Sequence, residues 1–324
     1  MLTIRQMMKY LRDHHHISIK SNQSYDLRNV GYYHGYKGYR FIREPVNTIP
    51  LTDFSELLAI NTFDMQLKTL FYPKMMFIET ALKSYVIEAV LADCHSESLN
   101  TIFNNSLTHY KTYTPGSRDY KKHFTKRMTL RGSIINTLKR DYGNDSKIVN
   151  HFFDRDREIP IWAIFETITL GEFGNFFWCC NKNVKTYTSN LLHLPTSLDS
   201  DGEQTRFIIF TLKDLRNAIA HNNVIFDARF GSPNLISGRL ITLLEQETGI
   251  KNIDFKYIDA YIILTVYALR KMKVTKTECK QFISTYNNAK QTLRKEIPVS
   301  VWNQILGTST QSNMNKLLTF ITNS

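Results

Sequence analysis

The chain has 324 residues, of which 42% are hydrophobic and 12% are aromatic, enough for a buried core rather than a disordered chain. Its 13 glycines and 8 prolines are too few for an all-β protein built from tight turns, so a mainly α fold is expected. The 41 Lys and Arg residues exceed the 29 acidic residues and give a net charge of +12, which favours a nucleic-acid partner, although many basic proteins bind none.

The four cysteines follow neither a metal-binding nor a disulfide spacing, so no metal and no other cofactor is predicted. Free thiols suit a reducing compartment. No stretch approaches the roughly 20 apolar residues that span a bilayer, and the N-terminus lacks the apolar run of a secretory signal. A cytoplasmic protein without membrane contact is therefore expected.

The N-terminal segment combines a short helix with a tyrosine-rich stretch. Apolar residues at helical spacing predict a helix over residues 1–12. Glycines in residues 25–41 predict a turn-rich piece. Tyr36, Lys37 and Arg40 are candidate RNA contacts, because aromatic rings stack on bases and cations bind phosphates. A turn that packs this segment onto the next helix is the competing interpretation.

A long helix is predicted from Thr52 to Cys94, because apolar residues recur three and four positions apart. Pro73 lies inside this span and favours a kink. Glu79 and Lys83 are four residues apart and share one helical face. By spacing alone they are interpreted as an ordinary surface ion pair.

Residues 111–147 form a concentrated basic segment, with ten Lys or Arg and three acidic residues. Apolar residues are sparse in its first half, which indicates an insertion between core helices. Such a run favours nucleic-acid binding, and a solvated basic loop is the alternative. Its candidate RNA-binding residues are Lys121, Lys122, Lys126, Arg127, Arg131, Lys139 and Arg140.

The rest of the chain is predicted to be helical apart from two irregular stretches. The expected elements are a buried helix beginning at Pro160 and broken near Gly171 and Gly174, a loop over 181–204, a helix over 205–220, irregular chain to about 238, and helices near 237–248 and 254–273 followed by further helical segments. Three regions are expected, at 1–50, at 51–240 with a basic insertion at about 100–150, and at 241–324.

The sequence LRNAIAHNN contains residues that could cut RNA without a metal. Histidine titrates near neutrality, so His221 could act as acid or base. Arg216 stays charged and binds phosphate oxygens, and Asn217 can orient the histidine or the phosphate. Asn217 and His221 share a helical face, whereas Arg216 lies about 140° around the helix from His221. Asn222 and Asn223 indicate that the helix ends here.

One histidine makes an incomplete acid–base pair. A two-fold homodimer that joins two such helices would supply two histidines and two arginines. A histidine near a helix C-terminus is also favoured by the helix dipole without any function. The motif alone therefore leaves both interpretations open.

RNAIAHNN resembles the Arg-Asn-three residues-His signature of HEPN ribonucleases. Together with VGYYHGYKGYRF, FDMQLKTLFYPKMMFIETALKSYV and PIWAIFETITLGEFGNFF, it resembles the Abi-like abortive-infection proteins of bacteria (AbiD/AbiF type) over most of residues 1–225. The resemblance implies a HEPN-like helical bundle and a metal-independent endoribonuclease toxin of phage defence. Arg216, Asn217 and His221 fall on its motif.

The same resemblance places Glu79 and Lys83 at the acidic and basic positions of the family's first long helix, so they are candidate catalytic residues too. It implies RNA as substrate and, for some relatives, a structured RNA as inhibitor, a partner that the basic segment would suit. A non-catalytic RNA-binding module that holds a structured RNA is the alternative function.

Overall fold

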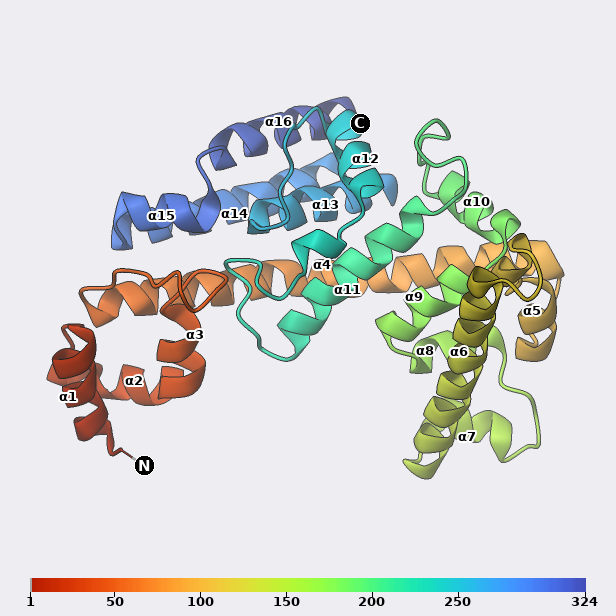
Figure 1. The fold of residues 1–324 in the computed structure, drawn as a ribbon, viewed down its shortest axis with the longest axis horizontal. Helices are drawn as coiled ribbons and strands as arrows, with labels where there is room; N and C mark the ends of the chain where they lie inside the picture. The colour runs from red at the N-terminus through yellow and green to blue at the C-terminus, as the bar shows by residue number, and fades with distance from the viewer. Residues whose placement is uncertain (1) are drawn as a thin grey trace. The chain divides into compact units, whose positions relative to one another are not determined.

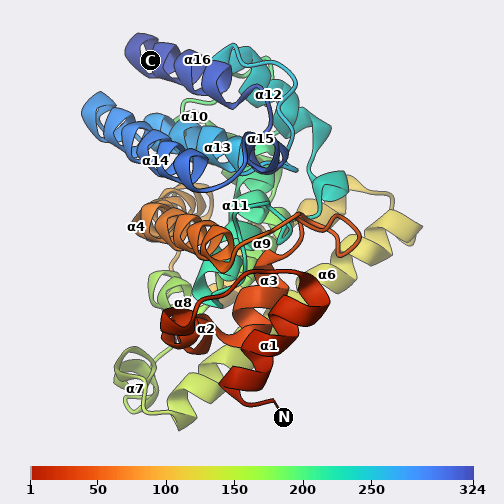
Figure 2. The same cartoon turned by 90° about the vertical axis from the view of Figure 1, so that its left-hand side faces the viewer.

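The structure is a computed structural model that describes residues 2–324. Within this range the chain forms sixteen α-helices and no β-strand, which confirms the expected mainly α fold. No helix among these residues is long and apolar enough to cross a membrane. Figures 1 and 2 show the ribbon from two directions.

The chain divides into two compact units. The first unit joins the residues up to Met75 with Asp214–Ser324, and the second unit is Met76–Lys213. The chain passes from the first unit to the second within α4 (Phe54–Cys94) and returns within α11 (Gln204–Ala220). These units follow contacts in space, whereas the three regions expected from sequence follow composition, and those regions stay a prediction.

The C-terminal part of the first unit is a bundle around one apolar helix. In α13 every residue from Ile258 to Leu269 is buried, as expected for a helix covered on all sides. It packs against three of the other helices of this part, which are drawn from cyan to blue in Figure 1. The helices of this part are α12 (Gly238–Thr248), α13 (Ile258–Lys271), α14 (Lys276–Glu296), α15 (Val299–Leu306) and α16 (Thr310–Asn323).

The N-terminal part of the first unit contains α1 (Ile4–His15), α2 (Ser24–Val30), a π-helical turn (Gly31–Tyr36) and α3 (Lys37–Tyr39). The prediction of a turn-rich stretch over 25–41 was wrong for residues 25–39, which are helical. Two of its glycines serve close packing rather than bends. A Cβ on Gly35 would lie 2.0 Å from Val30 Cγ1, and one on Gly38 would lie 3.3 Å from Val224 Cγ2.

The long helix is confirmed as α4, and it continues through Pro73. Leu57, Phe63, Leu67 and Phe71 bury the apolar face that the spacing predicted. The same face also buries two charged residues, which the apolar spacing did not predict and which are described below.

The second unit is built around a basic helix. Residues 118–143 form α6, which packs on α8 and α9 and buries Leu130, Ile134 and Leu138. The alternative of a basic loop was therefore wrong for most of this segment. The helices lying wholly within this unit are α5 (Leu99–Asn105), α6 (Arg118–Gly143), α7 (Lys147–Phe153), α8 (Ile161–Thr167), α9 (Leu170–Cys179) and α10 (Lys182–Leu191).

The buried helix expected after Pro160 is broken earlier than predicted. Gly171 and Gly174 lie inside α9, and the break falls at Ile168 and Thr169. The Thr169 side chain and Glu172 form a reciprocal capping box that starts α9. Gly174 is small for packing, since a Cβ there would lie 3.1 Å from Ile209 Cγ2.

The loop expected over 181–204 contains α10, which begins where the Asn181 side chain accepts the Val184 N–H. Its polar composition hid this helix. The helices expected near 205–220, 237–248 and 254–273 are confirmed as α11, α12 and α13.

Candidate functional site

The Arg-Asn-three residues-His motif ends α11. The main-chain N–H of His221 still donates to the Asn217 carbonyl at 3.0 Å, while Asn222 adopts a left-handed φ of 54°. The Asn223 N–H then reaches back to the Ala218 carbonyl at 2.8 Å, which closes the helix. The predicted helix stop is confirmed, and the His221 side chain lies exposed directly before it.

Arg216 and Asn217 lie together in the preceding turn. Arg216 Nη1 donates to Asn217 Oδ1 at 3.4 Å, and both side chains are half-buried. An arginine guanidinium carries five N–H donors and stays charged, so it suits phosphate oxygens as acceptors. The motif thus presents a cation, an amide and an imidazole within two turns of one helix end.

A buried ion pair on α4 fixes this helix end. Lys68 Nζ lies 2.8 Å from the Asp64 carboxylate and donates to Asn222 Oδ1 at 2.8 Å. Both charged side chains are buried, so each depends on its partners for the hydration it has lost. Asn222 is the residue next to His221, so this pair sets where the imidazole leaves the helix.

Asp64 also holds the chain that follows the motif. Its Oδ1 accepts the main-chain N–H groups of Ile225 and Phe226, each at 2.7 Å. Its Oδ2 accepts the Tyr39 hydroxyl at 2.9 Å. Burial and the neighbouring Asp64 carboxylate raise the pKa of Tyr39, so its phenol stays protonated and keeps donating.

A second carboxylate extends these contacts. Asp227 accepts the side chain of Arg229 and the main-chain N–H of Arg43. Arg229 in turn donates to the carbonyl oxygens of Gly38 and Phe41, at 2.9 and 2.7 Å. Stretches near residues 40, 65 and 225 are therefore joined by buried charged groups. The end of α11 and the chain that follows it are held by two distant parts of the sequence, near residues 40 and 65.

Glu79 and Lys83 form the expected ion pair, with Lys83 Nζ 3.1 Å from the Glu79 carboxylate. Their side chains are 12% and 13% exposed, so this pair is more buried than the surface pair that spacing indicated. Lys83 Nζ also donates to the Ile168 carbonyl at 3.3 Å. Both residues belong to the second unit, whereas the motif belongs to the first. A catalytic role of Glu79 and Lys83 stays a prediction.

The seven candidate cations of α6 differ in exposure. Lys121, Lys122, Lys139 and Arg140 are exposed, as an RNA-binding surface requires. Arg131, half-buried, donates to the Asn100 side chain at 2.8 Å.

Arg127 instead points into the second unit. It is buried, donates to the Phe103 carbonyl at 2.7 Å, and lies 3.8 Å from the centroid of the Phe103 ring. These contacts give Arg127 a structural part in packing α6 on α5.

The tyrosine-rich stretch is similarly divided. Tyr36 is buried, with its ring 5.5 Å from that of Tyr32 and 5.0 Å from that of His15. Arg40 lies over Tyr36 at 5.9 Å, whereas Lys37 is exposed. The interpretation that this stretch packs the N-terminal segment accounts for Tyr36, and Lys37 is the candidate that solvent reaches most readily.

Sequence reasoning missed the residues that hold the motif, namely Tyr39, Asp64 and Lys68. A signal was present, because Asp64 and Lys68 are four residues apart within an otherwise apolar helical face. In residues 2–324 no group of three or more His, Cys, Asp or Glu side chains could hold a metal ion.

The fold and this site define an all-helical protein with a polar motif held at a helix end. A family model described as Abi-like protein matches residues 25–227. The match covers more than half of the chain, so the protein belongs to the Abi-like family, which is linked to abortive infection. No curated protein and no solved structure matches it. The matched range ends at Asp227 and includes the residues that hold the motif.

Proposed function

We propose that this protein is a metal-independent HEPN endoribonuclease that acts as a toxin in abortive infection. The observation that carries the proposal is the exposed imidazole of His221, four residues after Asn217 and five after Arg216, at a helix end held by the buried Asp64–Lys68 pair. Catalytic groups need such support, because small displacements of a reacting group cost large factors in rate.

The chemistry assigned to these residues is transfer of the RNA phosphodiester to its own ribose. The 2′ oxygen attacks phosphorus, the bond from phosphorus to the 5′ oxygen breaks, and the products are a 2′,3′-cyclic phosphate and a 5′ hydroxyl. His221 accepts the 2′ proton or donates the proton to the leaving 5′ oxygen. Arg216 neutralises the phosphate charge that grows in the transition state, and Asn217 orients Arg216.

A single imidazole cannot serve as base and acid in the same step. A two-fold homodimer would supply a second copy of His221 and of Arg216. Glu79 and Lys83 are the candidates within the same chain, since they are a partly buried acid–base pair. In this proposal the exposed cations of α6 attract RNA, either the substrate or a structured inhibitory RNA.

The alternative function is a non-catalytic module that holds a structured RNA. This alternative is favoured by four exposed cations along one helix, since cations suit phosphate binding without catalysing a reaction. They are Lys121, Lys122, Lys139 and Arg140. The two functions differ in what His221 does.

Expression of His221→Ala in cells separates them. The ribonuclease predicts that this substitution removes growth arrest and stops the decay of cellular RNA, while the protein still binds RNA. His14→Ala is the matched control, since His14 is also an exposed histidine near the end of a helix. Growth arrest that persists in His221→Ala would contradict the catalytic proposal and favour the RNA-holding module.

A further inference from the structure

The second unit contains a cavity of about 390 Å³ between α6 and α9. This volume is within the range of pockets that bind small ligands, about 300–1,000 Å³. Its lining includes Lys122, His123 and Lys126 from α6, and Glu172, Asn175 and Trp178 from α9. The Glu172 carboxylate accepts from Ser133 and from the Thr169 N–H. The cavity therefore combines two lysines with one carboxylate, an amide and a large aromatic ring, all within one unit.

Trp178 is the centre of a cationic cluster. Lys126 Nζ lies 3.7 Å from the centroid of its ring, and Arg206 Cζ lies 4.8 Å from it. Partial burial lowers the pKa of Lys126, and the positive charges of Arg206 and Lys122 lower it further. Cations held this close repel each other, and a bound anion would relieve that repulsion.

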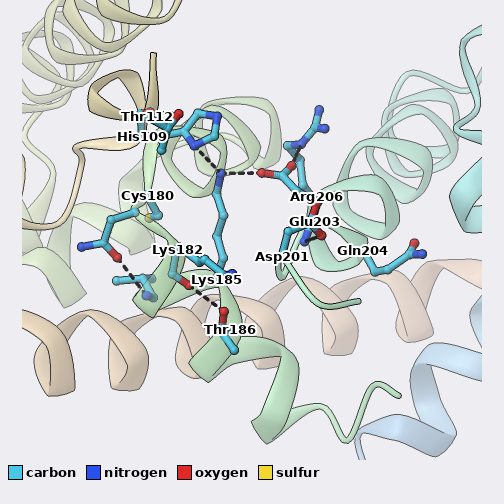
Figure 3. Close-up of polar contacts among 12 residues, drawn as sticks. His109, Thr112, Cys180, Lys182, Lys185, Thr186, Asp201, Glu203, Gln204 and Arg206 are labelled. Carbon is cyan, nitrogen blue, oxygen red and sulfur yellow. Dashed lines mark hydrogen bonds and ion pairs between the residues drawn. The ribbon is translucent and has the colours of Figure 1, made fainter. Parts of the chain in front are cut away.

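Arg206 is held in place by a buried relay of charges. Figure 3 shows Lys185 reaching both His109 and Glu203, with Glu203 facing Arg206. Lys185 is 1% exposed and lies 2.6 Å from the Glu203 carboxylate. Because Glu203 bridges two cations, Arg206 is fixed beside Trp178 rather than free to move in solvent.

Histidine rings connect this relay to the cavity. The His109 and His123 rings are 4.9 Å apart, and the His123 ring is 5.9 Å from Trp178. Burial lowers the pKa of His123, with the Lys122 charge as a further cause, which favours the neutral ring. The lining therefore offers two aromatic rings, nearly perpendicular to each other at 78°, next to Lys122 and Lys126.

We propose that this cavity binds a nucleoside phosphate, with the phosphate at Lys122 and Lys126 and the base against Trp178 and His123. Stacking on aromatic rings beside cations is how proteins hold bases without selecting a sequence. Asn175 can donate to or accept from the edge of the base. This inference deepens the proposed function, because it gives RNA a contact other than His221. It rests on the proposed function only where the ligand is a nucleotide within RNA, and not where the ligand is a free nucleotide.

The two sources of this ligand are a nucleotide within single-stranded RNA and a free nucleotide. Both are tested with the full chain carrying His221→Ala, so that the RNA stays intact. The probes are a fluorescein-labelled oligouridylate, followed by anisotropy, and uridine monophosphate, followed by calorimetry. The added variants are Lys126→Ala and Trp178→Leu, with Trp178→Phe to retain a ring.

Lys182→Ala is the matched control, because it removes the same charge from an exposed helical position of the same unit but does not line the cavity. We expect Lys126→Ala and Trp178→Leu to weaken oligouridylate binding about tenfold, and Lys182→Ala less than about twofold. Trp178→Phe is expected to restore most of the affinity. Circular dichroism of each variant verifies the fold.

Loss of oligouridylate affinity in the two cavity variants assigns RNA as the source. Loss of uridine monophosphate binding in those variants, with oligouridylate binding unchanged, supports the cavity but assigns a free nucleotide. Equal affinities of all variants for both probes, or an effect of Lys182→Ala as large as that of Lys126→Ala, would overturn the proposal. A chain with intact His221 that binds RNA through the cavity without cutting it would contradict the proposed function alone.

Discussion

Lys68 Nζ lies 2.8 Å from Asn222 Oδ1, so a buried ammonium on α4 contacts the residue that follows His221. The same ammonium pairs with Asp64 at 2.8 Å. Burial of this charge costs desolvation, which its contacts with Asp64 and Asn222 offset, and the same contacts fix its position. Here the geometry that it defines is the end of α11.

Replacement of Lys68 by methionine should destabilise the first unit strongly. The change leaves Asp64 buried with one partner fewer, and removing one member of a buried pair costs about 3–5 kcal/mol. Urea denaturation measures the free energy of unfolding. Lys74→Met on the same helix is the control, since Lys74 Nζ is 3.9 Å from Glu278 and both are partly exposed, and its cost should stay within about 0.5 kcal/mol. Equal losses for the two variants would show that the Lys68 pair is not structural.

Removal of the Tyr39 hydroxyl should also be costly. Tyr39→Phe deletes a buried hydrogen bond of 2.9 Å to the Asp64 carboxylate, and hydrogen bonds to charged groups contribute about 1.5–3 kcal/mol. The melting temperature should fall, and amide exchange at Ile225 and Phe226 should become faster. Tyr25→Phe, at a tyrosine that is 68% exposed, should change neither. Unchanged amide exchange at Ile225 and Phe226 would argue that Asp64 does not hold the main chain after α11.

The sequence predicted those parts of the fold in which apolar spacing is regular, such as α4, α11 and α13. It did not predict α10, or α6 as a helix, because most of their side chains are polar. Asp64–Lys68 and Glu79–Lys83 have the same spacing on the same helix. What distinguishes the buried pair is the set of groups that it meets, Tyr39, Asn222 and Ile225, and these come from distant parts of the chain that spacing does not reveal.

The sequence predicted the residues of the motif, but not Tyr39, Asp64 and Lys68, which hold the motif in place. Arg216, Asn217 and His221 were chosen because their side chains suit phosphodiester chemistry.

At the cavity of the second unit, Trp178 and Arg206 carried no such signal, since a tryptophan in an apolar run is usually core and an arginine on a helix is usually solvated. Their ring contact with Lys126 joins α6, α9 and α11, and only a folded chain brings these together.

Gly202 should tolerate no side chain. Its φ is +72°, and an added Cβ would lie 2.4 Å from the Lys185 carbonyl carbon. Gly202→Ala should therefore cost about 3 kcal/mol or more, from strain and from a clash with backbone. Gly249→Ala is the control, because Gly249 has a similar φ of +71° and nothing within 4 Å of an added Cβ. It should cost about 1 kcal/mol, and a similar loss at both positions in thermal unfolding would contradict the clash.

His109 should make stability depend on pH. Burial lowers the pKa of His109 from 6.5 to about 4, and the Lys185 cation adds to this shift. Below pH 6.5 the unfolded chain takes up a proton that the folded protein takes up only near pH 4, so folding stability is lost as the pH falls through this window. After allowance for partial exposure, the loss should be about 1–2 kcal/mol.

Urea denaturation at about pH 7.5 and about pH 5 measures this dependence. His109→Gln keeps an acceptor for Lys185 without the titration, so it should lose less stability between the two values than the wild type. His14→Gln, at an exposed histidine, should match the wild type. A wild-type slope that His109→Gln retains would show that other groups cause the acid sensitivity.

The central claim is that His221 cuts RNA without a metal, and RNA cleavage by the purified protein in excess EDTA tests it most directly. The product ends are identified by whether a kinase that acts on 5′ hydroxyls can label them, and by whether acid opens a cyclic phosphate. We predict cleavage in EDTA that leaves 2′,3′-cyclic phosphate and 5′ hydroxyl ends, that is lost in His221→Ala, and that falls about a hundredfold or more in Arg216→Ala. Cleavage that EDTA abolishes, or that His221→Ala retains at the wild-type rate, would contradict the account.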